Sequence, residues 1–155
     1  MKYILFLLIL ASKCTFGQLN VSYFPWHNML GLTQKFPYNF ALDYKLETNS
    51  FFNNMNMEFG ARRYILINEV IDREDYGKNF NNSICHYGFG IAFNPNNYRS
   101  NINTINGYYL DFGVRWSIPK REFLAIVLEC SPYVNQGFTN GNLRTRLGLA
   151  YRITK

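Results

Sequence analysis

The stretch Gly107–Ile118, GYYLDFGVRWSI, decides the fold of this chain. Its even-numbered positions are all apolar, whereas its odd-numbered positions include Asp111, Gly113 and Arg115. Successive side chains of a β-strand point to opposite faces of a sheet, so this alternation predicts a strand with one apolar and one polar face. The stretch is about as long as a strand that crosses a bilayer, which takes roughly 9–11 residues.

The same alternation recurs along the chain. Five further segments show it: Phe40–Leu46, Asn54–Ile67, Cys85–Phe93, Phe123–Ser131 and Leu143–Ile153. Two weaker strand candidates, Leu19–Phe24 and Met29–Lys35, lie on either side of Pro25, which has no N–H to donate to a central ladder. Because bacterial single-chain barrels have even strand numbers, we predict an all-β fold, an eight-stranded antiparallel up-and-down transmembrane β-barrel.

Two details fit this pattern less simply. Arg63 falls on the apolar face of its segment, which predicts either a β-bulge near Arg62–Arg63 or the end of the membrane-embedded part. With eight strands, Asn94–Asn106 and Asn135–Gly141 become outside loops, rich in Asn and Gly. The acidic link Glu69–Ser83 then lies on the periplasmic side, where turns are normally short, so either this link is unusual or the strand count is seven.

Residues 1–17 have the features of a cleaved signal peptide. Lys2 supplies a positive charge, Tyr3–Ala11 is an apolar stretch too short to span a bilayer, and Thr15 and Gly17 are small residues at positions −3 and −1 of the expected cleavage site. Residues 18–155 are therefore expected to form a single β-barrel domain that is exported and located in the cell outer membrane.

The cysteines add one alternative and one expectation. Cys14 raises the possibility of a lipid-modified N-terminus, although Lys13 before it fits such a site poorly. Cys85 and Cys130 are expected on the apolar face of strands that lie two apart, about 10 Å from each other. This exceeds the roughly 7 Å Cα separation that a disulfide tolerates, so both are expected to be small hydrophobic residues that face lipid.

Side-chain size indicates which face lies inside. An eight-stranded barrel has an interior just wide enough for its side chains, and the polar face contains small residues such as Gly60, Gly88, Gly113 and Gly148. The apolar face is therefore expected to contact lipid, whereas a soluble, lipocalin-like barrel would have its faces reversed. The predicted lipid-facing side chains are Leu42, Tyr44, Phe59, Phe89, Ile91, Leu110, Phe112, Val114, Trp116, Leu128, Leu147 and Leu149.

The predicted inner face carries a nearly balanced set of charges. Burial of such charges is tolerated when they are paired and hydrogen-bonded, so we expect a structural charge network in the barrel interior. Its predicted members are Asp43, Lys45, Glu47, Glu58, Arg62, Asp111, Arg115, Glu129, Arg144, Arg146 and Arg152.

The leader ending in TFGQ, the alternating strands and the closing segment SPYVNQGFTNGNLRTRLGLAYRITK resemble small outer-membrane β-barrels of the Bacteroidota type. Their architecture is like that of the OmpX and OmpA barrel domains, and the resemblance covers residues 18–155. Such barrels often end in an aromatic residue that the insertion machinery reads. This chain instead ends in Ile153-Thr154-Lys155, with Tyr151 nearby.

Few residues indicate chemistry. His27 lies in the first outside loop beside Trp26 and is a candidate catalytic group, although the sequence defines no Ser or Asp partner for it. His86 is expected to be a hydrogen-bonded polar group of the interior. The histidines and cysteines show no metal-ligand spacing, so no catalytic residue, metal site or cofactor is predicted. The acidic residues 71–75 could hold a cation, but a solvated turn is the simpler interpretation.

The expected function is that of a non-enzymatic outer-membrane β-barrel, a structural or accessory subunit of an outer-membrane assembly. Its expected partners are outer-membrane lipids and, through the loops, other outer-membrane proteins or a surface glycan. The formal net charge of +6 is interspersed with acids, which argues against nucleic acid. The alternatives are an outer-membrane lipid-modifying enzyme that uses His27, and a soluble periplasmic lipocalin-like carrier with an apolar cavity.

Overall fold

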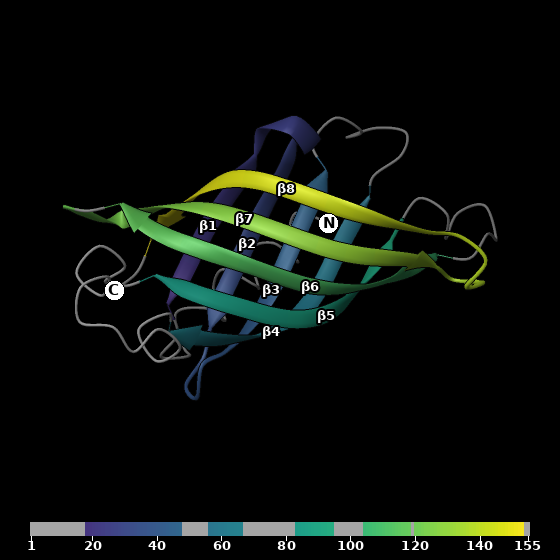
Figure 1. Ribbon diagram of the computed structural model, residues 1–155, viewed down its shortest axis with the longest axis horizontal. Coiled ribbons are helices and arrows are strands. Elements are labelled where there is room, and N and C mark those ends of the chain that lie inside the picture. The colour runs from purple at the N-terminus through teal and green to yellow at the C-terminus, as the bar shows by residue number, and fades with distance from the viewer. Residues whose placement is uncertain (1–17, 48–55, 67–82, 95–103, 119, 154–155) are drawn as a thin grey trace, which may run out of the picture.

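Eight antiparallel strands close into one barrel in chain order, each hydrogen-bonded to the next and the last to the first (Figure 1). The computed structural model describes residues 18–47, 56–66, 83–94, 104–118 and 120–153. The elements are β1 (Leu19–Phe24), the short 3-10 helix η1 (Pro25–His27), β2 (Met29–Lys35), β3 (Phe40–Glu47), β4 (Met57–Leu66), β5 (Ile84–Phe93), β6 (Ile105–Ile118), β7 (Arg121–Asn135) and β8 (Gly141–Arg152).

The predicted eight-stranded antiparallel up-and-down barrel is confirmed. The two weak strand candidates are β1 and β2, with the bounds expected for them. Pro25 does not interrupt a ladder, because it begins η1, the connection between these strands. The turn then closes at Asn28, which adopts a left-handed conformation (φ 43°) and donates its backbone N–H to the Pro25 carbonyl at 3.2 Å.

The predicted β-bulge at Arg62–Arg63 is wrong. β4 pairs with β3 and β5 in unbroken register, with Arg63 opposite Phe40 and Tyr87. The register shifts lie elsewhere, between Ala92 and Phe93 of β5 and between Ser117 and Ile118 of β6. Arg63 therefore remains on the outer face, and its partner Phe40 is the first residue of β3, so this arginine lies near one rim of the barrel.

The two ends of the barrel differ. The end that carries η1 also carries the β3–β4, β5–β6 and β7–β8 connections, and we call it the η1 end. At the opposite end, which we call the terminal end, the two ends of the described chain meet, because Ile153 donates its backbone N–H to the Leu19 carbonyl at 2.9 Å. The predicted signal peptide and most of the acidic link lie outside the described residues. Within the described part, no helix is long and apolar enough to span a membrane.

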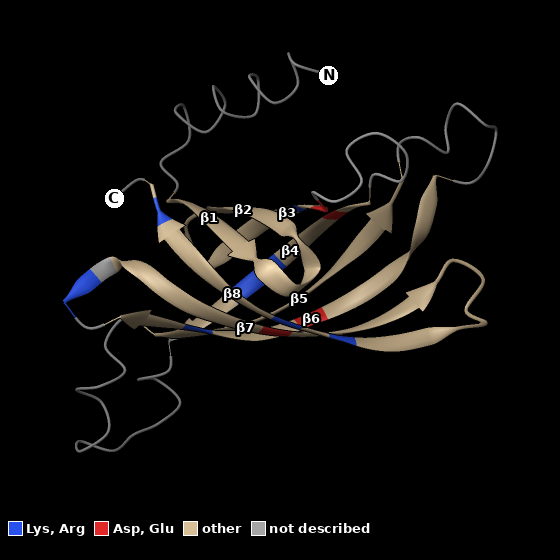
Figure 2. Ribbon diagram, turned by 90° about the horizontal axis from the view of Figure 1, so that it is seen from above, with Lys and Arg blue, Asp and Glu red and all other residues tan. Residues whose placement is uncertain are grey.

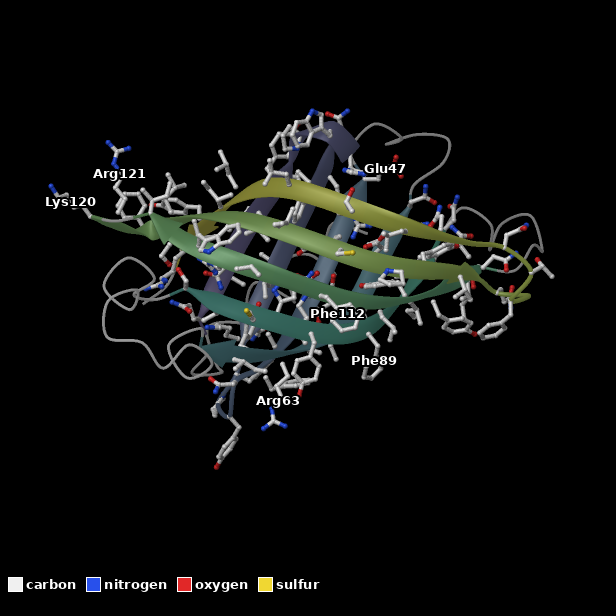
Figure 3. The ribbon with its side chains drawn as sticks, in the orientation of Figure 1. Glu47, Arg63, Phe89, Phe112, Lys120 and Arg121 are labelled. Carbon is white, nitrogen blue, oxygen red and sulfur yellow. The ribbon has the colours of Figure 1, made fainter. Side chains whose placement is uncertain are left out.

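The two faces of the sheet differ sharply in polarity. Leu110, Phe112 and Leu149 are 51%, 46% and 54% exposed on the outer surface, whereas Arg115 and Arg146 are 7% and 2% exposed inside. Figure 3 shows Phe89 and Phe112 projecting away from the barrel, and Figure 2 shows charged positions on several of the strands. The barrel therefore has an apolar exterior and an ionic interior.

The cysteines lie on the sheet as expected from the strand order. Cys85 of β5 pairs with Val114 of β6, and Cys130 of β7 pairs with Phe112 of the same strand. β6 thus separates the two thiols, and both are free.

Candidate functional site: the barrel interior and the cavity at the η1 end

Arg62 is the centre of the buried charges. Its guanidinium lies 2.9 Å from the Asp43 carboxylate, 2.5 Å from that of Asp111 and 2.7 Å from that of Glu129. These acids come from β3, β6 and β7, so one planar cation on β4 connects three other strands across the interior. All four side chains are at most 5% exposed.

Lys45 completes this central cluster. Its ammonium lies 2.6 Å from Glu129 and 3.4 Å from Asp43. Hydroxyl groups supply further hydrogen bonds, from Thr33 to Asp43 at 2.6 Å and from Ser131 to Asp111 at 2.9 Å. Several partners therefore surround each buried carboxylate, as the burial of charge requires.

A second cluster lies nearer the η1 end. One carboxylate oxygen of Glu58 accepts hydrogen bonds from Arg144 at 2.9 Å and from Arg146 at 2.5 Å. Arg146 also lies 3.8 Å from Glu129, which joins this group to the central cluster. The Arg144 guanidinium stacks over the Tyr133 ring, 3.6 Å from its centroid.

Eight of the eleven predicted network residues meet in these two clusters. They are Asp43, Lys45, Glu58, Arg62, Asp111, Glu129, Arg144 and Arg146. Glu47 lies apart at the η1 end, where it accepts a hydrogen bond from Asn56 at 2.8 Å. Arg115 and Arg152 have no ion pair with a described carboxylate, and each leaves a buried nitrogen without a hydrogen bond.

The twelve residues predicted to face lipid all lie on the outer face of the barrel. The more exposed of them are Phe89, Leu110, Phe112, Trp116, Leu128, Leu147 and Leu149, and the half-buried ones are Leu42, Tyr44, Phe59, Ile91 and Val114. Part of the interior is filled by apolar residues that the sequence analysis did not identify. Phe24, Met29 and Val127 form one small apolar cluster with Ala150, and Tyr64 and Ile84 form another with Ala41.

His86 departs from its prediction. It is buried, but both ring nitrogens lack a hydrogen-bond partner, so the expected satisfied polar group is not found. Its Nε2 lies 3.6 Å from Asp111 and 4.0 Å from Glu129, and these three residues could in principle hold a metal ion. Arg62 already binds both carboxylates, however, so a metal ion would compete with a guanidinium for the same oxygens. We assign no metal to this group.

A cavity of about 510 Å³ occupies the barrel interior at the η1 end. Every strand from β2 to β8 contributes to it, together with η1. Its lining residues are Trp26, His27, Met29, Glu47, Asn56, Glu58, Ala92, Asn106, Tyr133, Arg144 and Arg146. Charged, amide and imidazole side chains share this wall with Trp26, Met29, Ala92 and Tyr133, so it differs from the apolar cavity expected of a lipocalin-like carrier.

A chain of hydrogen bonds crosses the cavity wall. The Asn56 amide donates to Glu47, the Asn106 amide donates to Asn56 Oδ1 at 3.2 Å, and the Tyr133 hydroxyl donates to the Asn106 carbonyl at 2.9 Å. These bonds hold β3, the residue before β4, β6 and β7 in place relative to one another. The sequence could not predict these hydrogen bonds, because they depend on which strands lie side by side across the interior and on their register.

His27 lines the same cavity. Burial, and then the positive charge of Arg146, lower the pKa of His27 below its ordinary value of 6.5, so the imidazole is neutral at pH 7. Its Nδ1 is buried without a hydrogen-bond partner. No Ser, Thr or Cys is among the described residues that line the cavity, and the hydroxyl of Tyr133, which does line it, donates to the Asn106 carbonyl.

The geometry defines a class of protein, a closed eight-stranded up-and-down β-barrel with an apolar outer face and a charge-filled interior. Comparison with known proteins finds no matching family model, curated protein or solved structure.

Proposed function

We propose that this chain is a bacterial outer-membrane β-barrel, a non-enzymatic structural or accessory subunit of an outer-membrane assembly. One observation carries the proposal: the large apolar side chains point outward while the charges lie inside. Residues such as Phe89, at 68% exposure, would present apolar surface to water, at about 25 cal/mol for each Å². A bilayer removes this penalty, and in a closed barrel every strand is paired on both sides, as a membrane requires.

The interior supports a structural role rather than a channel. The central cluster joins β3, β4, β6 and β7 through contacts of 2.5–3.4 Å, and it lies where a pore would have to pass. Eight strands also leave little room beyond the side chains themselves. We therefore propose a closed barrel that contacts lipid around its circumference and other outer-membrane proteins through its loops.

The leader-like N-terminus and the resemblance to small Bacteroidota-type barrels support an outer-membrane location. In this orientation the η1 end faces the exterior and the terminal end faces the periplasm. Arg63, which lies near the terminal rim, would then reach the polar interface of the inner leaflet with its long side chain.

Fractionation of cells that express the full chain tests the location. We expect the protein in the outer-membrane fraction, resistant to alkaline carbonate and extracted only by detergent. Recovery in the soluble periplasm without detergent would contradict the proposal. Planar-bilayer recording of the purified protein tests the closed interior, for which no large, stable single-channel steps are expected.

A further inference from the structure

The cavity at the η1 end has the size and construction of a ligand site. Its volume of about 510 Å³ falls within the range of small-molecule pockets, about 300–1,000 Å³. Such pockets are usually lined mostly by apolar side chains, but here seven of the eleven lining residues have charged, amide or imidazole side chains, beside Trp26, Met29, Ala92 and Tyr133. An acyl chain would leave these polar groups without hydrogen bonds, whereas a ligand with both apolar and polar faces matches the whole wall.

The charges around the cavity balance one another. Glu47 and Glu58 carry two negative charges, Arg144 and Arg146 carry two positive charges, and His27 is neutral at pH 7. The opposite charges are also interleaved, since one oxygen of Glu58 binds both arginines. An anion or a cation would be attracted by one of these groups and repelled by its neighbour. A zwitterion needs a positive and a negative region that are separate, and this wall has none. The cavity therefore favours an uncharged polar ligand.

Several polar atoms of this wall lack partners. Glu58 Oε2 and Arg146 Nε make no hydrogen bond, although both side chains are at most 3% exposed, whereas Arg146 Nη1 lies 3.8 Å from Glu129 Oε2. His27 Nδ1 is also buried and unbonded. A hydroxyl group can donate one hydrogen bond and accept two, so neighbouring hydroxyls of one ligand can satisfy the carboxylate and the guanidinium at the same time.

Trp26 supplies an aromatic face at the rim. It lines the cavity but is 74% exposed, so much of its ring is free to contact a ligand. The C–H face of a sugar ring is apolar, while its edge carries hydroxyls. A pyranose can therefore cover apolar surface of Trp26 while its hydroxyls reach the polar wall.

We propose that the cavity at the η1 end binds an uncharged carbohydrate, either as a free saccharide or as the end of a surface glycan. The binding groups are the Trp26 ring, the Glu58 and Arg144–Arg146 cluster, and the Asn56 and Asn106 amides. The inference rests on the cavity alone, so it holds whether or not the barrel proves to be a membrane protein.

Tryptophan fluorescence of the full chain tests the proposal. The sequence has two tryptophans, and Trp116 lies on the outer face, so a Trp116→Phe protein reports from Trp26 alone. The protein is held in a detergent without a sugar headgroup, because glucoside and maltoside detergents would compete. The probes are glucose, N-acetylglucosamine and maltose as free saccharides and a neutral dextran as the glycan, with inorganic phosphate and glycine betaine as charged comparisons.

We expect a saturable change of Trp26 emission with at least one neutral saccharide or with dextran, and none with the charged probes. Arg144→Met should weaken binding about tenfold or more, which corresponds to one charged hydrogen bond of about 1.4 kcal/mol. Thr145→Ala changes the adjacent side chain, which is exposed rather than part of the cavity wall, and should leave binding unchanged. The proposal is overturned if neither saccharides nor dextran bind, if phosphate or betaine binds more tightly, or if Arg144→Met binds like the parent. Retention of the heat-modifiable, folded band by each variant separates lost binding from lost folding.

Discussion

Arg62 and Arg115 are two buried arginines in very different surroundings. Arg62 touches three carboxylates, whereas Arg115 forms no ion pair with a described carboxylate and leaves Nη2 unbonded. Loss of one partner of a buried ion pair costs about 3–5 kcal/mol. Removal of a buried charge that has no counter-charge among the described residues instead relieves a desolvation cost. We therefore expect Arg62→Met to lower the free energy of unfolding by about 3–5 kcal/mol and Arg115→Met to leave it unchanged or raise it.

Urea unfolding of the refolded barrels, followed by tryptophan fluorescence, measures both changes. Equal losses of stability for the two variants would show that Arg62 and Arg115 are equivalent, contrary to their different surroundings among the described residues. The sequence could place both residues on the inner face because that requires only the alternation of β4 and β6. It could not distinguish them, because the partners of Arg62 come from across the barrel and depend on register and stagger.

Gly88 marks a close approach of two backbones. A Cβ atom added there would overlap the Ala61 carbonyl oxygen on the paired strand β4. Backbone cannot move aside as a flexible side chain can, so Gly88→Ala should cost about 1–3 kcal/mol. Gly137 is the matched control, since its nearest neighbour would lie 3.8 Å away, and Gly137→Ala should be nearly neutral in the same urea titration. A neutral Gly88→Ala would contradict this close packing.

His27 should make stability depend on pH in a definite direction. The fold lowers the pKa of His27 below 6.5, so neutral His27 is favoured in the folded state. Its contribution is present above pH 6.5 and is lost as the pH falls below this value, because the unfolded chain then binds the proton first. We expect the barrel with His27→Gln to lose less stability than the parent between pH 7.5 and pH 5.5. Other titrating groups are common to both proteins, so an identical loss would contradict the assignment.

At the scale of the element, β6 presents an apolar ridge whose environment can be tested. Phe112 lies near its middle and is 46% exposed. In a bilayer, Phe112→Arg should cost about 2–4 kcal/mol, whereas Leu143→Arg near the η1 end of β8 should cost about 0–1 kcal/mol. In a water-soluble barrel, both exposed positions would change stability by at most about 0.5 kcal/mol.

Unfolding of each variant from lipid vesicles gives the two values. A depth-dependent difference supports the membrane proposal, and two small, equal effects contradict it. The control is matched in orientation because Leu143, at 63% exposure, is also a large apolar residue on the outer face of a strand.

The strands were largely predictable from sequence because their signal is local. A period of two over seven or more residues can be recognised without knowledge of the neighbouring strands. β1 and β2 were weaker candidates, included because bacterial barrels have even strand numbers, and their observed bounds match those expected. Arg63 allowed two predictions, a bulge or the end of the membrane-embedded part, and the unbroken register excludes only the bulge. The cavity was beyond prediction, since its wall combines residues from η1 and seven strands.

At the scale of the whole molecule, closure depends on the seam between β1 and β8. This pair has four residues in register, from Asn20 to Tyr23 on β1, whereas β7 and β8 share eleven. Closure also brings together the two ends of the described chain. The β1–β8 contacts therefore join residues that are farther apart in sequence than in any other strand pair, and their loop-closure entropy is the largest. The seam is therefore the shortest junction of the barrel and the one that defines it as closed.

A disulfide across the seam would test closure directly. Val21 is the register partner of Tyr151, and paired antiparallel residues have Cα atoms about 4.5–5.5 Å apart, within reach of a disulfide. In a background whose three native cysteines are replaced by alanine, Val21→Cys with Tyr151→Cys should form a bridge that is visible as a mobility shift on non-reducing gels. The control pairs Val21→Cys with Leu124→Cys, whose strand lies one further along and about 10 Å away, so no bridge is expected. A bridge in the control pair but not in the seam pair would show that β1 does not close against β8.

A bridge at the seam alone should also raise the urea concentration at the unfolding midpoint, because it restrains nearly the whole barrel in the unfolded state.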